Sequence, residues 1–533
     1  MYKQPALPLV LASLCISLAA FSVHASQANA EEGASRLLPE AAAIVLDLKA
    51  PELDELKQNV YVGLLAIGAP EGMDYMEIGA QVVLNNYSLF KQAMDTRSVV
   101  DMEKFDSPSK HYGNKPALKW DSGKDRIHFP YACRRLDAPD CIGEVLAKKE
   151  QLSALMKKEA NITLMQRYKK ILGLPHYQAH YYTLSDPLPQ YQYQVTFSCM
   201  RLTQALFAFD EGNVDAGFEL LGEEMAATKR MLRENESLIG HTIAVVMLYP
   251  HYHTISVLMD TPQMKPYLQD PRLLALLAPL TIEEQKALSR SFTIERNNSL
   301  YSVYMLDANS SLSGIDQQEI LSLLDKLSPA LSETEKRDFL NRLEQSDAAS
   351  DYDRHGTVNM FYRIWEPVLQ RAGMSTEEVT HLYTQNRLEN LQEAAEKSYQ
   401  KQLVREIEVR KNNPRIPLNI TGRILTDIPS VGFESSLQRF YDVQSYILLV
   451  NAKHQILSRG LESSEVEPFL KSAGKATQNP MTGERFAWDA TAGTLSTDWL
   501  SKPLPSGARE ICEKGKCEKE NMPRNTVYLK LNH

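Results

Sequence analysis

Apolar positions recur at helical spacing along most of the chain. Between residues 214 and 232 they alternate in steps of four and three, which places them on one side of a helix. These positions are Val214, Phe218, Leu221, Met225, Thr228 and Leu232. Charged residues fall mostly on the other side, as on a helix half exposed to water. The pattern predicts an amphipathic helix over 214–232.

A second helix is predicted directly before this one. Residues 196–209 form an apolar run, and Gly212-Asn213 separates it from the helix at 214. Two helices joined by so short a turn form an antiparallel hairpin. The next stretch, 237–249, is apolar on all sides, so we expect a buried central helix that Pro250 ends or kinks.

Capping boxes mark further helix starts, because a Ser or Thr followed three residues later by Glu satisfies free backbone N–H groups at both positions. The pairs are Thr281 with Glu284, Ser332 with Glu335, and Ser375 with Glu378. The last pair begins a charged segment that predicts a long helix to about residue 411. Its neighbouring opposite charges are typical of a solvated face.

Strand patterns are confined to the carboxyl end. Residues 486–495 alternate loosely around a turn at Ala492-Gly493, and 525–531 form a clearer strand. The fold class predicted is all-α, with antiparallel helical hairpins or a bundle and a small disulfide-pinned β appendage at the C-terminus. The expected divisions are a signal peptide (1–25), an N-terminal region of mixed helices and loops (26–140), a helical body (141–430), and a C-terminal helix with a small β segment (431–533).

Composition narrows the class of protein. The 533 residues carry a net charge of −9, and 43% are hydrophobic, which is a globular composition. The chain has no basic block of the kind that binds nucleic acid. No apolar stretch after residue 25 is long enough to span a bilayer.

The amino terminus has the pattern of a secretory signal. Lys3 precedes an apolar stretch over 6–23, and Val23-His24-Ala25 offers small residues for cleavage before Ser26. Ala28-Asn29-Ala30 is a second cleavage site. We therefore expect a periplasmic protein; an uncleaved helix would instead anchor it in the inner membrane.

Export changes the interpretation of the cysteines. Cys133 and Cys141 bracket one short segment, and Cys512 and Cys517 bracket another with Gly515 in its turn. In an oxidising compartment each pair is expected to form a local disulfide, worth roughly 2–2.5 kcal/mol from loop entropy. The alternative, zinc binding, lacks the usual two-residue spacing. Cys199 lies in an apolar stretch and is expected to be a buried small hydrophobe.

Two groups of side chains could carry chemistry. His176 and His180 are four residues apart, and His251 and His253 follow the apolar helix that contains His241. If they converged they could bind a metal or supply a general base. The other interpretation is ordinary loop and helix-end histidines, because Pro175 opposes a helix there and no acidic partner has diagnostic spacing. On that basis no metal and no cofactor is predicted.

Tyrosines are concentrated close to the first histidine pair. They are Tyr177, Tyr181, Tyr182, Tyr191 and Tyr193. Tyrosine presents an apolar face and a polar tip, which suits a groove for sugars or peptides. It also packs commonly between helices, and the sequence favours packing over a groove.

Two further motifs are not interpreted as functional sites. Ser107-x-x-Lys110 has the spacing of a β-lactamase motif, but Pro108 opposes the helix that motif needs, so we treat it as chance. In the segment from Asn479 to Trp488, Pro480 and Gly483 predict a turn that folds over the preceding helix. No other hydrolase, nucleotide or dinucleotide motif is found.

Several segments together resemble a group of uncharacterised proteobacterial envelope proteins. They are, in order, Asn59-Val-Tyr-Val-Gly-Leu-Leu-Ala-Ile-Gly-Ala-Pro with Ile78-Gly79, the Cys133 and Cys141-Ile142 pair with Arg167-Tyr168, Arg233-Glu-Asn-Glu-Ser-Leu-Ile-Gly-His-Thr-Ile-Ala, Leu280 to Glu284 with Glu295, and Asn479-Pro-Met-Thr-Gly-Glu-Arg-Phe-Ala-Trp. The resemblance implies an exported all-α protein, and the group carries no assigned activity or catalytic residues to transfer.

The sequence therefore favours a non-catalytic periplasmic protein that binds a partner or organises the envelope. The expected partner is another envelope protein, or a peptide or saccharide ligand; nucleic acid is not expected, and a membrane only if the amino-terminal helix is retained. The alternatives are a metal-dependent hydrolase that uses the histidines, and a membrane-tethered subunit of a secretion or pilus-like machine.

Overall fold

The fold was obtained as a computed structural model and is mostly helical. It describes residues 37–46, 48–96, 104–121, 141–180, 186–305, 353–385, 433–498, 510–513, 516–519 and 525–528, and the single helical positions 334, 337, 341 and 401. The signal segment, Cys133, Tyr181, Tyr182 and the Ser332 capping box lie outside these residues.

The helices follow one another with short connections over most of the described chain. In order they are α2 (Pro39–Leu46), α3 (Leu53–Leu56), α4 (Val60–Leu65), α5 (Tyr75–Thr96), η2 (Pro108–His111), α6 (Cys141–Leu146), α7 (Lys149–Met156), α8 (Glu159–Leu172), α9 (Tyr191–Asp210), α10 (Val214–Glu234), α11 (Leu238–Leu258), η4 (Lys265–Tyr267), α12 (Pro271–Leu276), α13 (Ile282–Lys286), α14 (Leu288–Met305), α18 (Arg354–Ala372), α19 (Thr376–Gln385), α22 (Phe433–Arg459), α23 (Ser463–Ser472) and η7 (Gly474–Thr477).

The predicted hairpin is confirmed as α9 and α10, which pack against each other. Gly212 turns the chain with a positive φ of 77°, a conformation that costs glycine little. The Asn213 side chain then caps α10 by accepting from the Ala216 N–H at 3.4 Å. Phe218, Leu221 and the next positions of the predicted stripe are buried.

The central helix is confirmed. Of the two outcomes predicted at Pro250, an end of the helix is wrong, because α11 continues to Leu258, and a kink stays a prediction. Pro250 has no N–H and its ring disturbs the preceding turn, which leaves carbonyl groups there short of partners. The His251 Nδ1 contacts the Met247 carbonyl oxygen one turn back. This imidazole contact compensates part of the loss and helps the helix to pass through the proline.

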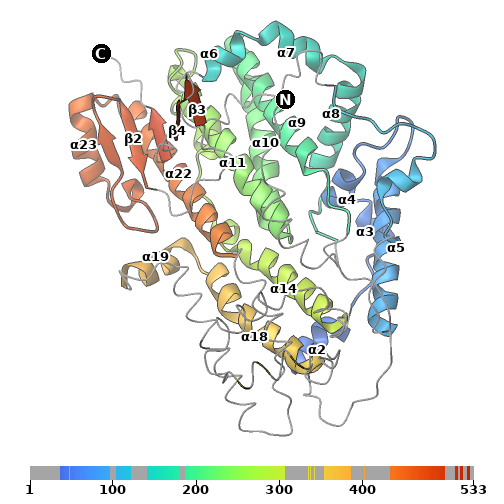
Figure 1. Ribbon diagram of the computed structural model, residues 1–533. Helices are drawn as coiled ribbons and strands as arrows, with labels where there is room; N and C mark the ends of the chain where they lie inside the picture. Colours follow the sequence, from blue (N-terminus) through green and yellow to red (C-terminus); the bar gives the residue numbers. More distant parts are fainter. Residues whose placement is uncertain are drawn as a thin grey trace.

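Helix pairs build the rest of the body. In Figure 1, α22 lies beside α11, and α14 lies beside α18 with α2 next to both. The Thr281 and Ser375 capping boxes form as predicted, at the starts of α13 and α19. The helix predicted from 375 to about 411 is described as far as Gln385 and again at position 401.

The β appendage contains two small antiparallel sheets. One has the order β1 (Ala487–Asp489), β2 (Thr494–Thr497), β5 (Asn525–Tyr528), and the other pairs β3 (Glu510–Glu513) with β4 (Lys516–Lys519). Gly493, with φ of 62°, lies in the turn between β1 and β2 as predicted. No disulfide is seen in the part of the chain that the structure describes.

The principal hydrophobic core is shared by distant parts of the sequence. It includes Val60 and Leu64 of α4, the inner faces of α9, α10 and α11, and Phe440 and Tyr446 of α22. It extends to Phe486 and Leu495 of the C-terminal segment. Parts of the predicted N-terminal region, helical body and C-terminal segment therefore meet in one core. A second core joins α2, α5, α14 and α18.

Candidate functional site

The histidines predicted as possible metal ligands face different partners. His251 contacts Ser198 of α9, and His253 Nδ1 lies 3.2 Å from the Tyr446 hydroxyl of α22. His180 lies edge-on to Tyr61, and burial lowers its pKa to about 4. His176 is exposed and pairs through its backbone with the chain around Asn59. Among the described residues no group of three or more His, Cys, Asp or Glu side chains could hold a metal ion.

The described tyrosines of the predicted groove lie in or against the core. The Tyr177 hydroxyl donates to Gln194 Oε1 at 3.1 Å, and the Tyr191 hydroxyl lies 3.4 Å from Ser237 Oγ. Tyr193 stacks on Phe197 and donates to the Leu118 carbonyl oxygen. Tyr177 and Tyr191 are buried, so these side chains join the starts of α9 and α11 to their neighbours. A ligand groove at these tyrosines stays a prediction.

The most concentrated buried chemistry lies between α8, α9, α10 and α11. Glu224 of α10 is fully buried, and its Oε1 lies 2.6 Å from Nε of Arg201 of α9. The Tyr168 hydroxyl of α8 donates to Glu224 Oε2 at 3.2 Å. Arg201 also pairs with Glu223, which is partly exposed. A buried ion pair is stable only when its remaining hydrogen bonds are satisfied, and this one has several partners.

A serine and a histidine extend this cluster. Ser198 of α9 lies on the same face as Arg201, and its Oγ is 3.3 Å from His251 Nε2 of α11. We call Tyr168, Ser198, Arg201, Glu224 and His251 the buried polar cluster.

Burial controls the protonation of this cluster. It raises the pKa of Glu224 to about 7, although Arg201, Ser198 and Tyr168 stabilise the carboxylate and oppose the shift. It also lowers the pKa of His251 to about 4, against the contact with the Met247 carbonyl. Near neutral pH the imidazole is therefore uncharged, and burial makes the Glu224 carboxyl easier to protonate than an exposed one.

This cluster was not predicted from the sequence, although a signal for it is present there. Glu224 lies three residues after Leu221 and four before Thr228, on the apolar stripe of its helix. Arg201 lies inside the apolar run that became α9. A charged residue on a core-facing position of each helix of a hairpin is the pattern of a buried ion pair.

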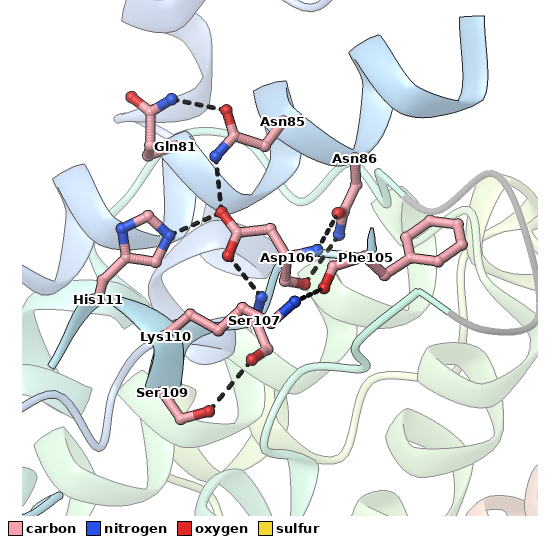
Figure 2. A network of polar contacts seen from close by, with 9 residues as sticks. All are labelled: Gln81, Asn85, Asn86, Phe105, Asp106, Ser107, Ser109, Lys110 and His111. Atoms are coloured by element: carbon pink, nitrogen blue, oxygen red, sulfur yellow. Dashed lines mark hydrogen bonds and ion pairs between the residues drawn. The ribbon is translucent and has the colours of Figure 1, made fainter. Parts of the chain in front are cut away.

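A second polar network surrounds the Ser107-x-x-Lys110 motif (Figure 2). Asp106 Oδ2 accepts from Asn85 at 2.6 Å and lies 2.7 Å from His111 Nε2, while Asn86 pairs with the Asp106 backbone. Lys110 Nζ donates to the Phe105 carbonyl oxygen, and the Ser107 hydroxyl lies 3.1 Å from the Ser109 hydroxyl. The network ties this loop to α5.

Burial raises the pKa of Asp106, but the hydrogen bonds from His111, Asn85 and the Ser107 N–H outweigh it, so the net pKa lies below its usual value. The loop therefore stabilises the carboxylate form of Asp106.

Several residues of the segments on which the predicted resemblance rests hold backbone in place. Arg167 donates to the carbonyl oxygens of Ile67, Ala69 and Pro70, just after α4. Asn235 accepts from the Ser237 N–H at 2.7 Å and packs against Gly240 at the start of α11. These contacts give Arg167 and Asn235 a structural role in the fold.

The turn at Asn479 joins the C-terminal segment to the body as predicted. Asn479 Oδ1 accepts from the Met481 and Thr482 N–H groups, and its Nδ2 donates to Thr497 Oγ1 at 3.0 Å. Gly483 has a positive φ of 70°. The contacts and the burial of Asn479 make this segment a structural turn.

None of the described helices is long and apolar enough to cross a membrane. Family models, curated proteins and solved structures were each compared with the chain, and none matched. The resemblance to envelope proteins therefore stays a prediction.

Proposed function

We propose that the protein is exported and acts without catalysis, as a helical scaffold that binds another envelope protein. One observation supports this most directly: the buried side chains best suited to chemistry are occupied in holding the fold. Arg167 holds the chain after α4, His251 supports α11 at Pro250, and Glu224 pairs with Arg201. Such side chains build a rigid body rather than an open reactive centre.

The proposal of export includes the two predicted disulfides. In the β3–β4 hairpin Cys512 and Cys517 are cross-strand partners, one step from the Glu513–Lys516 pair that closes the turn. Directly opposed Cα atoms in an antiparallel pair lie about 4.5–5.5 Å apart, within the range that a disulfide spans. This register supports the pairing of Cys512 with Cys517; the Cys133–Cys141 pairing rests on sequence alone.

Partner binding is tested by site-specific photo-crosslinking in the native host. A photoreactive residue is placed in turn at four exposed apolar positions on different elements, Leu53, Ile162, Leu274 and Ile282. We expect one position to yield one reproducible adduct with one protein, identified by mass spectrometry and bound again when both are purified. The other positions are matched controls for random capture. Free monomer at all four positions would contradict the proposal.

Export is tested separately on protein from the native host. Mass spectrometry is expected to find a new amino terminus at residue 26 or 31 and peptides linked through Cys512 and Cys517, with Cys199 as the internal thiol control. An intact Met1 together with fully reduced cysteines would contradict the proposed export. It would leave the crosslinking result unaffected.

A further inference from the structure

The solvent-facing side of α10 changes from acidic to basic along the helix. Positions 215, 219, 222, 226, 229 and 233 follow one another in steps of four and three, so they lie on one side of the helix. None of them is buried, whereas Phe218 and Leu221 on the opposite side belong to the principal core. We call this set the α10 outer face: Asp215, Glu219, Gly222, Ala226, Lys229 and Arg233.

The order of residues on the α10 outer face is complementary to itself. When two copies of α10 run antiparallel and are centred on position 224, the acidic half of each copy meets the basic half of the other. The pairs across the contact are then Asp215 with Arg233, Glu219 with Lys229, and Gly222 with Ala226. A two-fold axis makes each pair occur twice, as in an isologous interface.

The centre of the α10 outer face has room for a second helix. A Cβ added to Gly222 would meet nothing within 4 Å, so no contact inside the chain requires glycine there. Glycine in the interior of a helix is destabilising relative to alanine. The distance between packed helices depends on the side chains at their contact, and small residues such as Gly222 and Ala226 allow a close approach.

The inner charges of the face, Glu219 and Lys229, form no ion pair within the residues that the structure describes. Lys229 Nζ donates to the Ala278 carbonyl oxygen at 2.8 Å, and the buried Glu284 attracts it from within the fold. No hydrogen bond from the Glu219 side chain to another described residue accompanies these contacts. A second copy would place the carboxylate of Glu219 opposite the ammonium group of Lys229.

The outer charges of the face are engaged within the chain but remain accessible. Asp215 pairs with Arg272 of α12 at 2.7 Å, and its side chain is 90% exposed. Arg233 pairs with the neighbouring Glu234 at 2.7 Å, and 35% of its side chain is exposed. Each can therefore meet a further opposite charge at the surface.

An apolar segment runs beside the α10 outer face. Residues 271–282 are held along α10 by two contacts, from Arg272 to Asp215 and from Lys229 to Ala278. The inner side chains of the segment are in the core, but six outer apolar residues are exposed: Pro271, Leu274, Ala275, Ala278, Pro279 and Ile282. A two-fold axis that makes α10 antiparallel to its copy keeps both segments on the same side of the helix pair. Contact between them would remove this apolar surface from water.

We propose that the protein forms a two-fold symmetric dimer, in which two α10 outer faces pack antiparallel and the two segments 271–282 lie side by side. A stable interface takes roughly 20–30 residues from each chain, so the helix face alone is too narrow and the apolar segment widens it. An anionic membrane fits the pattern less well, because it would attract one end of the face and repel the other. The dimer requires neither export nor an envelope partner.

Charge reversal at the inner pair tests the register by sedimentation equilibrium of the purified protein. The wild type is expected to be a dimer. Glu219→Lys brings like charges together at two symmetric contacts, and Lys229→Glu does so with the opposite sign. Each should raise the dimer dissociation constant by about tenfold or more. An equimolar mixture of the two variants should dimerise again, because every contact in the mixed dimer joins opposite charges.

Ala226→Arg tests the centre of the face without disturbing the core, because position 226 is exposed. The long side chain prevents the close approach of the helices, so this variant should be a monomer with an unchanged far-ultraviolet circular dichroism spectrum. Ala154→Arg, at an exposed position of α7, is the matched control and should remain a dimer.

Three results would overturn the proposal. One is a wild-type protein that is monomeric at every concentration. Another is a dimer that folded Glu219→Lys and Ala226→Arg leave unchanged, since its interface would then lie elsewhere. The third is a failure of the two charge-reversal variants to associate on mixing although both are folded. If Lys229→Glu does not fold because it loses the bond to Ala278, the first two results decide.

Discussion

At the scale of single residues, close packing between a side chain and the backbone shapes the start of α11. The position concerned is Gly240. A Cβ added to Gly240 would lie 1.9 Å from Nδ2 of Asn235, whose side chain also accepts from the Ser237 N–H. The position therefore excludes larger residues for a reason of space, although helices in general disfavour glycine.

We expect Gly240→Ala to lower the free energy of unfolding by about 1–3 kcal/mol, because Asn235 must move and loses its capping geometry. Gly222→Ala is the matched control in the neighbouring helix, where an added Cβ meets nothing within 4 Å. There alanine should be neutral or stabilising by up to about 1 kcal/mol. Urea denaturation of both variants measures the difference, and equal effects would refute the packing argument.

At the scale of elements, a few polar side chains join helices that lie far apart in the sequence. Arg167 of α8 is buried and reaches three carbonyl groups in the segment after α4, while its guanidinium lies over the Tyr75 ring at the start of α5. Burial lowers the pKa of Arg167, although nearby Tyr75, Tyr112 and Glu71 oppose the shift. A planar guanidinium suits this task, because it can donate in several fixed directions.

Arg167→Met is expected to destabilise the protein by about 3 kcal/mol or more, since three buried carbonyls lose a charged donor. Arg167→Lys should restore only part of this loss, because an ammonium group lacks the fork geometry. Lys169→Met changes an exposed cation on the same helix and should stay within about 0.5 kcal/mol of the wild type. Thermal unfolding of the three variants provides the comparison; full rescue by lysine would contradict the argument.

At the scale of the whole molecule, the C-terminal segment completes the principal core. Phe486 and Leu495 are buried with the residues of α22, and the Asn479 turn connects the segment to that helix. Ser445 of α22 donates to Asn479 Oδ1 at 3.4 Å, and Asn479 Nδ2 donates to Thr497 of β2. The side chain thus links the turn, a strand and the helical body.

Asn479→Ala should release the C-terminal segment without unfolding the body. Hydrogen exchange is expected to speed up over 479–498, with α9 and α10 unchanged, and global stability to fall by about 2–3 kcal/mol. Asp489→Ala is the control, because its carboxylate accepts from the Thr491 and Ala492 N–H groups in an exposed turn. It should affect that turn alone; uniform protection changes in Asn479→Ala would argue against a local link.

Much of the local structure could be predicted from the sequence. The α9–α10 hairpin, the Thr281 and Ser375 caps and the turns at Gly483 and Gly493 all follow from signals within a few residues of each other. The candidate site could not be predicted in the same way. Glu224 and Arg201 are a hint of an ion pair, but the addition of His251 requires the packing of a third helix.

The sequence by itself determined where α10, α11, α13 and α19 begin and which face of α10 is buried, because periodicity and capping act within one or two turns. Only the tertiary structure decided that α11 passes through Pro250 and that Ser198 of α9 meets His251 of α11. These outcomes depend on which groups meet across helices, and in a buried interior each polar atom must find its partner there. Spacing along the chain does not contain that information.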